Sequence, residues 1–281
     1  MALGLIAKKV KKKRMINMEK DIRPDKWALV TGASSGIGRE IVRLLEFYGY
    51  GAILVARRRS RLEDIAKGLK YKSYIIEADL SQPSAARELC EKLGQLEEEK
   101  SIKVDLLVNN AGFGDLGFFG DTDLGKELDM IHVNIESLHI LMKYYLKKFV
   151  IENRGYILNV ASSAGLMPAG PYMSTYYATK AYVTSLTSGV AKELKYRDSR
   201  VVVSALCPGP VDTEFNDVAN CSFDIGSIGP GQCAREALEN LFKGKTIIVP
   251  STKMKLATKF SKILTRNRLI DICGRQQKKK I

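Results

Sequence analysis

A tyrosine and a lysine four residues apart, Tyr176 and Lys180, are the side chains whose types and spacing best fit proton-transfer chemistry. In a helix, residues at this spacing lie on one face, with about 5–6 Å between their Cβ atoms. A neighbouring ammonium makes the phenolate more accessible at neutral pH, although the unperturbed pKa of a tyrosine is about 10. Tyr176 is therefore a candidate to exchange a proton with a substrate oxygen. Ser162 ends an apolar, strand-like run and would present its hydroxyl to the same oxygen.

A glycine-rich turn, Thr31-Gly32-Ala33-Ser34-Ser35-Gly36-Ile37-Gly38, separates the short apolar run 27–30 from a helical pattern. Strand, glycine turn and helix is the context in which such a motif binds a dinucleotide. Gly32 would permit the tight turn, Gly36 the close approach of a pyrophosphate, and Gly38 the close packing of helix on strand. The pyrophosphate would sit at the positive N-terminal end of the helix.

Three consecutive arginines follow the second apolar run, 51–56. An Asp or Glu at this point would bind the free 2′-hydroxyl of NAD, whereas arginines suit a 2′-phosphate. The sequence therefore favours NADPH over NADH. Arg57, nearest the end of the run, is the predicted phosphate contact, and Arg58 is the second choice.

Apolar runs alternate with helical patterns through the first half of the chain. The predicted strands are 27–30, 51–56, 73–78 and 104–108, and the predicted helices are 38–48, 60–69, 83–99 and 123–151. This alternation predicts a parallel, doubly wound α/β sheet, with a last strand at 245–250. Asp79 and Leu80 follow the third strand, where the carboxylate could meet an adenine ring.

These motifs, taken in order, resemble those of the short-chain dehydrogenase/reductase family, and they span about 180 of the 281 residues. The shared pieces are Thr-Gly-x-x-x-Gly-x-Gly at 31–38, Asn-Asn-Ala-Gly at 109–112, Asn134, Ser162, Tyr176-x-x-x-Lys180 and Pro208-Gly209. The spacing between Gly32 and Gly36 is similar to that of the single-domain members. The resemblance implies a Rossmann-type, mostly parallel seven-stranded sheet with helices on both faces.

The resemblance also implies a role for each catalytic residue. Tyr176 is implied as the general acid in reduction and the base in oxidation. Lys180 would lower the pKa of that tyrosine and hold the nicotinamide ribose, and Ser162 would orient the substrate oxygen. Asn134 would bend its helix to hold a water in a proton relay through Lys180.

The implied cofactor site gathers residues from the whole length of the domain. Asn110, Ala111 and Gly112 would line the cofactor, and the stretch 208–213 would contact the nicotinamide amide. The predicted cofactor-binding residues are Gly32, Ser34, Ser35, Gly36, Ile37, Gly38, Arg57, Asp79, Leu80, Asn110, Ala111, Gly112, Tyr176, Lys180, Pro208, Gly209, Val211 and Thr213.

Two serines compete for the catalytic position. The family usually places its serine 13 residues before the tyrosine, which would select Ser163. The surrounding pattern, Asn-hydrophobic-x-Ser with Gly165 three residues on, selects Ser162 and implies one extra residue near 168–171. We favour Ser162 because loops absorb insertions more readily than strand ends do.

The segments that follow the predicted strand ends carry few charges and many apolar side chains. These are Phe113, Leu116, Phe118, Phe119, Leu166, Met167, Pro168, Tyr172, Met173, Phe215, Val218, Phe223, Ile225 and Ile228. The stretch 214–230 is predicted to be a mobile lid. We expect a bulky apolar ketone or secondary alcohol as substrate, such as a steroid or a long-chain acyl compound.

The net charge of +14 lies in the two ends of the chain, since residues 1–26 carry +6, residues 251–281 carry +9 and the middle carries −1. We expect a disordered N-terminal extension over 1–26 and one domain over 27–250. Residues 251–281 have the apolar spacing of a basic amphipathic helix, which would pack on the protein, on a second subunit or on an anionic membrane surface. A specific nucleic-acid partner would more often meet a basic face on the folded body, so we expect none.

The remaining composition points to an intracellular protein without a metal. Five widely spaced cysteines and two histidines predict reduced thiols and no metal site. No apolar run reaches the length of a membrane span, and the N-terminal residues do not have the order of a secretory signal. We expect a cytoplasmic location and a homodimer or homotetramer.

The sequence thus predicts an NADP(H)-dependent oxidoreductase that interconverts a ketone and a secondary alcohol on a bulky hydrophobic substrate. The alternative is a dinucleotide-binding regulatory protein whose basic tails associate with a membrane or with nucleic acid.

Overall fold

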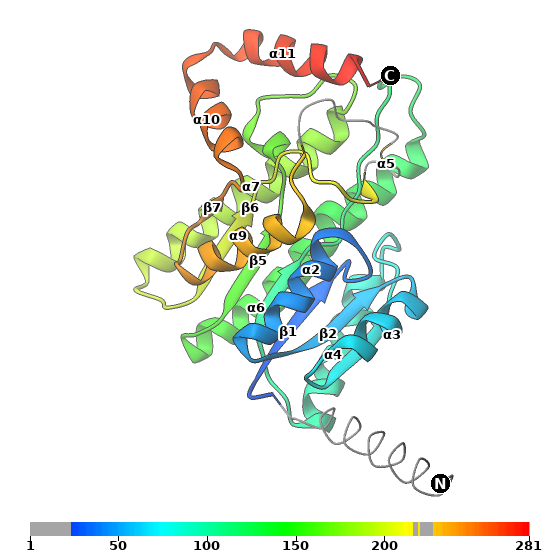
Figure 1. Cartoon of the computed structure of the whole chain (residues 1–281), viewed down its shortest axis with the longest axis vertical. Helices are drawn as coiled ribbons and strands as arrows, with labels where there is room; N and C mark the ends of the chain where they lie inside the picture. The colour runs from blue at the N-terminus through cyan, green and yellow to red at the C-terminus, as the bar shows by residue number, and fades with distance from the viewer. Residues whose placement is uncertain (1–23, 216–218, 220–226, 281) are drawn as a thin grey trace, which may run out of the picture.

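The computed structural model describes residues 24–215, 219 and 227–280. Within them, seven strands form one sheet in the order β3-β2-β1-β4-β5-β6-β7, and each pair of neighbours is parallel (Figure 1). The strands are β1 (Lys26–Thr31), β2 (Tyr50–Ala56), β3 (Ser73–Glu77), β4 (Val104–Asn109), β5 (Tyr156–Val160), β6 (Val202–Leu206) and β7 (Ile247–Ile248). The predicted seven-stranded parallel α/β sheet is confirmed.

Helices cover both faces of this sheet. The longer ones are α2 (Gly36–Leu45), α3 (Arg59–Gly68), α4 (Ala85–Lys100), α5 (Leu124–Ile131), α6 (Leu138–Glu152), α7 (Ser174–Tyr196), α9 (Pro230–Phe242), α10 (Thr252–Phe260) and α11 (Arg266–Lys278). Side chains of β1 alternate between the faces, as the pleat of a strand requires. Ala28 and Val30 pack with α2 and α9, while Trp27 and Leu29 pack with α4, α6 and α7.

The strand order reverses at β1, which pairs with β2 on one side and with β4 on the other. In an open parallel sheet, ligands bind beyond the carboxyl ends of the strands at such a switch point. The glycine turn follows β1, the arginines follow β2, and residues 109–112 close and follow β4. The sheet therefore brings segments far apart in the sequence to one edge.

The C-terminal region lies at this same edge. Its two helices, α10 and α11, are joined through a short 3₁₀ turn, Ser261–Ile263, and Figure 1 shows them beyond the carboxyl ends of β5 and β6. No helix in the described part of the chain is long and apolar enough to cross a bilayer. The predicted disordered extension lies, apart from residues 24–26, outside the described residues, as does most of the predicted lid, at 216–218 and 220–226.

Candidate active site

The glycine turn after β1 is built so closely that side chains would not fit. Gly32 and Gly36 have φ angles of +62° and +53°, which L side chains rarely adopt. A Cβ at Gly38 would lie 2.4 Å from Asn110 Nδ2 and 2.5 Å from the carbonyl oxygen of Gly32. Asn110 in turn donates from Nδ2 to the carbonyl oxygens of Thr31 and Gly32, at 3.0 and 3.1 Å. These contacts fix the turn after β1 against the segment after β4.

The N-terminal end of α2 is open toward the same space. Ser35 is its N-cap but makes no side-chain cap hydrogen bond, and no acidic residue stands in the first turn. Backbone N–H groups at a helix N-terminus therefore remain available to an anion.

Arg58 lies next to Ser34 and Ser35 of the glycine turn. Its Nη2 donates to Ser34 Oγ and Ser35 Oγ, both at 3.1 Å, and its Nη1 pairs with the Glu214 carboxylate at 2.8 Å. Arg61 pairs with the other oxygen of Glu214. Hydrogen bonding from Arg58 holds the pKa of Glu214 below its usual value. Arg57, the first choice from the sequence, lines the same cavity.

Tyr176 and Lys180 lie in the first turns of α7, and both are buried. Lys180 Nζ lies 5.9 Å from the centroid of the Tyr176 ring and donates to the carbonyl oxygen of Val160 at 3.0 Å. Burial lowers the pKa of Lys180 to about 8. A Cβ at Gly112 would stand 3.1 Å from Lys180 Nζ, so that glycine leaves room beside the ammonium.

Asn134 is fully buried in a π-helical stretch, His132–Ser137, between α5 and α6. Its side chain bonds to both backbone groups of Phe113, accepting from N at 3.1 Å and donating to O at 2.9 Å. It also donates to Thr179 Oγ1 on α7 at 3.0 Å. Asn134 therefore ties the segment after β4 to the helix that carries Tyr176.

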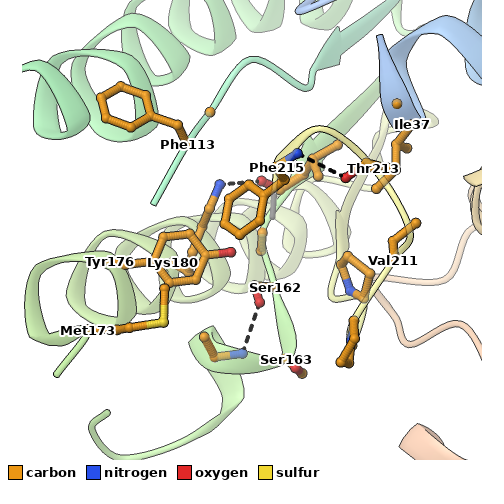
Figure 2. Close-up of a pocket in the computed structure, with 18 of the residues that line it drawn as sticks. Ile37, Phe113, Ser162, Ser163, Met173, Tyr176, Lys180, Val211, Thr213 and Phe215 are labelled. Atoms are coloured by element: carbon orange, nitrogen blue, oxygen red, sulfur yellow. Dashed lines mark hydrogen bonds between the residues drawn. The ribbon is translucent and has the colours of Figure 1, made fainter. Parts of the chain in front are cut away.

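The two serines after β5 differ in orientation. Ser162 Oγ accepts from the backbone N of Ala164 at 3.1 Å at the start of a short 3₁₀ helix, Ser163–Leu166. The backbone N of Ser163 donates to the carbonyl oxygen of Pro208 at 2.7 Å. Figure 2 shows the Ser162 hydroxyl on the side of the Tyr176 phenol, with Ser163 beyond it.

A cavity of about 820 Å³ connects these elements. It is lined by every cofactor and catalytic residue predicted from the sequence except Gly38 and Asn134, which lie behind its wall. Of the apolar side chains predicted for the substrate side, Phe113, Leu116, Met167, Met173 and Phe215 pack in one cluster with Tyr176, whereas Phe118 and Phe119 are exposed to solvent. Leu166 packs in a separate cluster with Val183, and Val218, Phe223 and Ile225 lie outside the described residues.

The sequence did not indicate that α10 and α11 would form one wall of this cavity. Cys273 and Gln277 of α11 are buried, and Gln277 Nε2 donates to Tyr177 Oη at 2.8 Å. Met254 of α10 packs on Gly209, where a Cβ would approach Met254 Cγ to 2.7 Å. The apolar spacing of the segment predicted a helix, but spacing alone does not tell which surface the helix covers.

A family model described as "short chain dehydrogenase" matches residues 26–221 of this chain. The chain belongs to the short-chain dehydrogenase/reductase family. As a member, it is an oxidoreductase acting on CH–OH groups and their carbonyl counterparts. The expectation drawn from the motifs is confirmed at the level of the family.

Three proteins of known name are similar to this chain in sequence or in structure. A very-long-chain 3-oxoacyl-CoA reductase of Anas platyrhynchos is 28% identical over 257 residues, covering 84% of this chain and 80% of its own. A short-chain dehydrogenase from Sphingobium yanoikuyae, solved in complex with NADPH, has a TM-score of 0.75 at 26% identity, covering 85% of this chain and 92% of its own. A 7beta-hydroxysteroid dehydrogenase structure has a TM-score of 0.77 at 25% identity and covers 89% and 97%.

Proposed function

We propose that this protein is an NADP(H)-dependent oxidoreductase that interconverts a ketone and a secondary alcohol on a bulky hydrophobic substrate. The observation that carries the proposal is the position of Tyr176. Its ring lies beside the buried ammonium of Lys180, in a cavity that runs from the glycine turn to apolar side chains.

The residues after β1, β2 and β4 fit a nicotinamide dinucleotide. The absence of a side chain at Gly36 keeps the space beside Thr213 open, since a Cβ there would come within 3.1 Å of Thr213 Cγ2, and the open end of α2 offers backbone N–H groups to a pyrophosphate. When bound, the cofactor supplies the hydride that reduces the carbonyl carbon. The preference for NADPH rests on Arg57 and Arg58, whose guanidinium groups would meet a 2′-phosphate.

The protein's own residues supply the proton and hold the substrate oxygen. Tyr176 donates the phenolic proton to the oxygen as negative charge develops there, and it takes the proton back in the oxidation direction. The positive charge of Lys180 stabilises the phenolate that remains. The Ser162 hydroxyl donates a second hydrogen bond to the same oxygen and so orients the carbonyl. Asn134 keeps Phe113 and α7 in register around this site.

The substrate class follows from the apolar side of the cavity. Phe113, Met167, Met173 and Phe215 offer a surface for a large hydrocarbon body. The named relatives act on long acyl chains and on steroids, and both kinds of compound have such a body. A cytoplasmic location and a homodimer or homotetramer remain predictions that accompany this function. The regulatory alternative gains no support, since the relatives are named as reductases and dehydrogenases.

The test is turnover followed by NADPH and NADH absorbance, with a panel of ketosteroids, 3-ketoacyl esters and small diketones. We expect turnover with NADPH on a bulky class and little on the diketones. Arg58→Ala and Arg57→Ala should weaken NADPH binding while leaving NADH binding unchanged. Tight NADPH binding with no turnover on any bulky ketone would contradict the proposed reaction, and equal use of both cofactors would contradict the role of the arginines.

A further inference from the structure

The helices α10 and α11 present an apolar surface to solvent. Leu256, Phe260 and Ile263 are spaced four and three residues apart, which places them on one side of the helical segment. Their exposed fractions are 52%, 65% and 79%. The exposed fractions of Leu264 and Ile272 are 39% and 38%. We call these five residues the C-terminal apolar rim.

The C-terminal apolar rim surrounds part of the opening of the active-site cavity. Phe260, Leu264 and Ile272 line the cavity and are also exposed. Leu256 and Ile263 are exposed without lining it. Through Phe260, Leu264 and Ile272 the apolar wall of the cavity therefore continues onto the outer surface.

The residues around the rim carry an excess of positive charge. Residues 251–281 contain ten lysines and arginines and one acidic residue, Asp271. Lys253, Lys259, Arg266, Arg268 and Arg275 are exposed on α10 and α11. Lys255 pairs with Glu236 of α9 at 3.1 Å. With ten basic residues against one acidic residue, the segment carries a net charge of +9.

We propose that the C-terminal apolar rim docks on an anionic phospholipid bilayer and that the apolar substrate enters the cavity from the lipid. Helices that carry apolar side chains flanked by lysines and arginines bind in the interfacial plane of a membrane without spanning it. Anionic lipids attract the surrounding cations, and the rim side chains enter the boundary of the acyl chains. A substrate dissolved in the bilayer then reaches the cavity along apolar surface.

Charge decides between the bilayer and a second copy of this chain. A two-fold contact through the rim would place two segments of charge +9 against each other, which disfavours self-association. A bilayer with anionic headgroups offers the complementary charge and an apolar phase together.

The experiment is co-sedimentation of the full chain with vesicles of phosphatidylcholine alone and of phosphatidylcholine mixed with phosphatidylglycerol. We expect binding to the mixed vesicles that weakens as salt rises, and little binding to phosphatidylcholine alone. The double variant Leu256→Ser/Ile263→Ser should lower binding about tenfold or more. Neither residue lines the cavity, so turnover of a substrate dissolved in water should stay unchanged.

The matched control is Phe47→Ser/Ile151→Ser. Both side chains are 85% exposed, and they lie after α2 and at the end of α6, at the edge of the sheet opposite the cavity. This variant should bind the vesicles as the unchanged protein does.

The proposal is overturned if no vesicle binding occurs, if the rim variant binds undiminished, or if removal of residues 1–23 alone abolishes binding. A dimer that the rim variant dissociates, with no vesicle binding, would overturn it in favour of self-association. The vesicle measurement needs no substrate, so its outcome is separate from that of the proposed reaction.

Discussion

The nucleotide half of the cavity is walled by the glycine turn and by the segments that follow β2 and β4, whereas the substrate half is walled by α7, α10, α11 and the segment after β5. The first half depends on the close packing of the glycine turn, since a Cβ at Gly38 would lie 2.5 Å from the Gly32 carbonyl oxygen. The second half depends on contacts between side chains of distant segments, such as the hydrogen bond between Gln277 and Tyr177. The turn therefore tolerates almost no added atom, while the side chains of the substrate half can be replaced to admit a different substrate. We therefore expect mutations in the two halves to separate cofactor binding from substrate binding.

The largest effect is expected at Gly38. An alanine there would force its Cβ to within 2.4 Å of Asn110 Nδ2 and 2.5 Å of the Gly32 carbonyl oxygen. Gly38→Ala should weaken NADPH binding about 100-fold or more, since the turn must move away from the pyrophosphate position. Fluorescence titration measures the binding, and circular dichroism verifies the fold. Gly189→Ala in α7, where a Cβ meets nothing within 4 Å, is the control and should bind normally. Unchanged binding by Gly38→Ala would contradict the close packing of this turn.

The next effect is the pH dependence of stability due to Lys180. Burial lowers its folded-state pKa from 10.5 to about 8, so the folded state binds fewer protons than the unfolded state between these values. Stability should rise with pH through this window. Lys180→Met removes the buried ammonium, so the variant should be more stable than the unchanged protein at pH 7. This difference in the free energy of unfolding should shrink by up to about 3 kcal/mol from pH 7 to pH 10. Urea unfolding at each pH measures it, and a difference independent of pH would show that Lys180 is not desolvated.

A smaller effect, confined to the substrate half, is expected at the Gln277–Tyr177 hydrogen bond. Gln277→Leu frees α11 from α7 and should raise KM for a bulky ketone about tenfold, with NADPH affinity unchanged. Tyr177→Phe removes the same bond, so the double variant should lose little more than either single one. Gln232→Leu, on α9 away from the cavity, is the control. Equal losses in substrate and cofactor affinity would show that the two halves are not separable.

The smallest effect is expected at Glu214, where the two halves meet. Its carboxylate pairs with Arg58, which is proposed to bind the 2′-phosphate, and with Arg61. Glu214→Gln should strengthen NADPH binding by about threefold and leave NADH binding unchanged, because the arginines keep more positive charge for the phosphate. Glu40→Gln, which loses similar pairs to Arg39 and Arg43 on α2, is the control. Weaker NADPH binding by Glu214→Gln would instead mean that the carboxylate positions Arg58 usefully.

Local patterns were sufficient to predict the sheet and to select residues that the structure brings together around one cavity. The glycines after β1 and the pair Tyr176 and Lys180 have spacings set by a turn and by a helix, and both spacings are visible in the sequence. The family model matches residues 26–221, the stretch that holds these motifs. Alternation of apolar runs and helical patterns was enough for the parallel sheet because crossover connections are regular.

Contacts between distant segments were not predictable in this way. Whether Arg57 or Arg58 binds a 2′-phosphate depends on the direction in which each side chain points. Arg58 bonds to Ser34 and Glu214, and only tertiary packing determines this direction for two neighbouring residues. The position of α11 depends on Gln277 reaching Tyr177, 100 residues earlier in the chain. An amphipathic pattern indicates that a helix has an apolar face but does not name the surface that the face meets.

The most direct test of the account is the turnover of Tyr176→Phe. The substitution removes one hydroxyl, so kcat with a bulky ketone should fall about 100-fold or more while the Kd for NADPH stays the same. Tyr182 lies on the same helix as Tyr176, and its hydroxyl is bonded to His139 of α6; Tyr182→Phe should keep full turnover. Undiminished turnover by Tyr176→Phe would contradict the assignment of Tyr176 as the proton donor and, with it, the proposed mechanism.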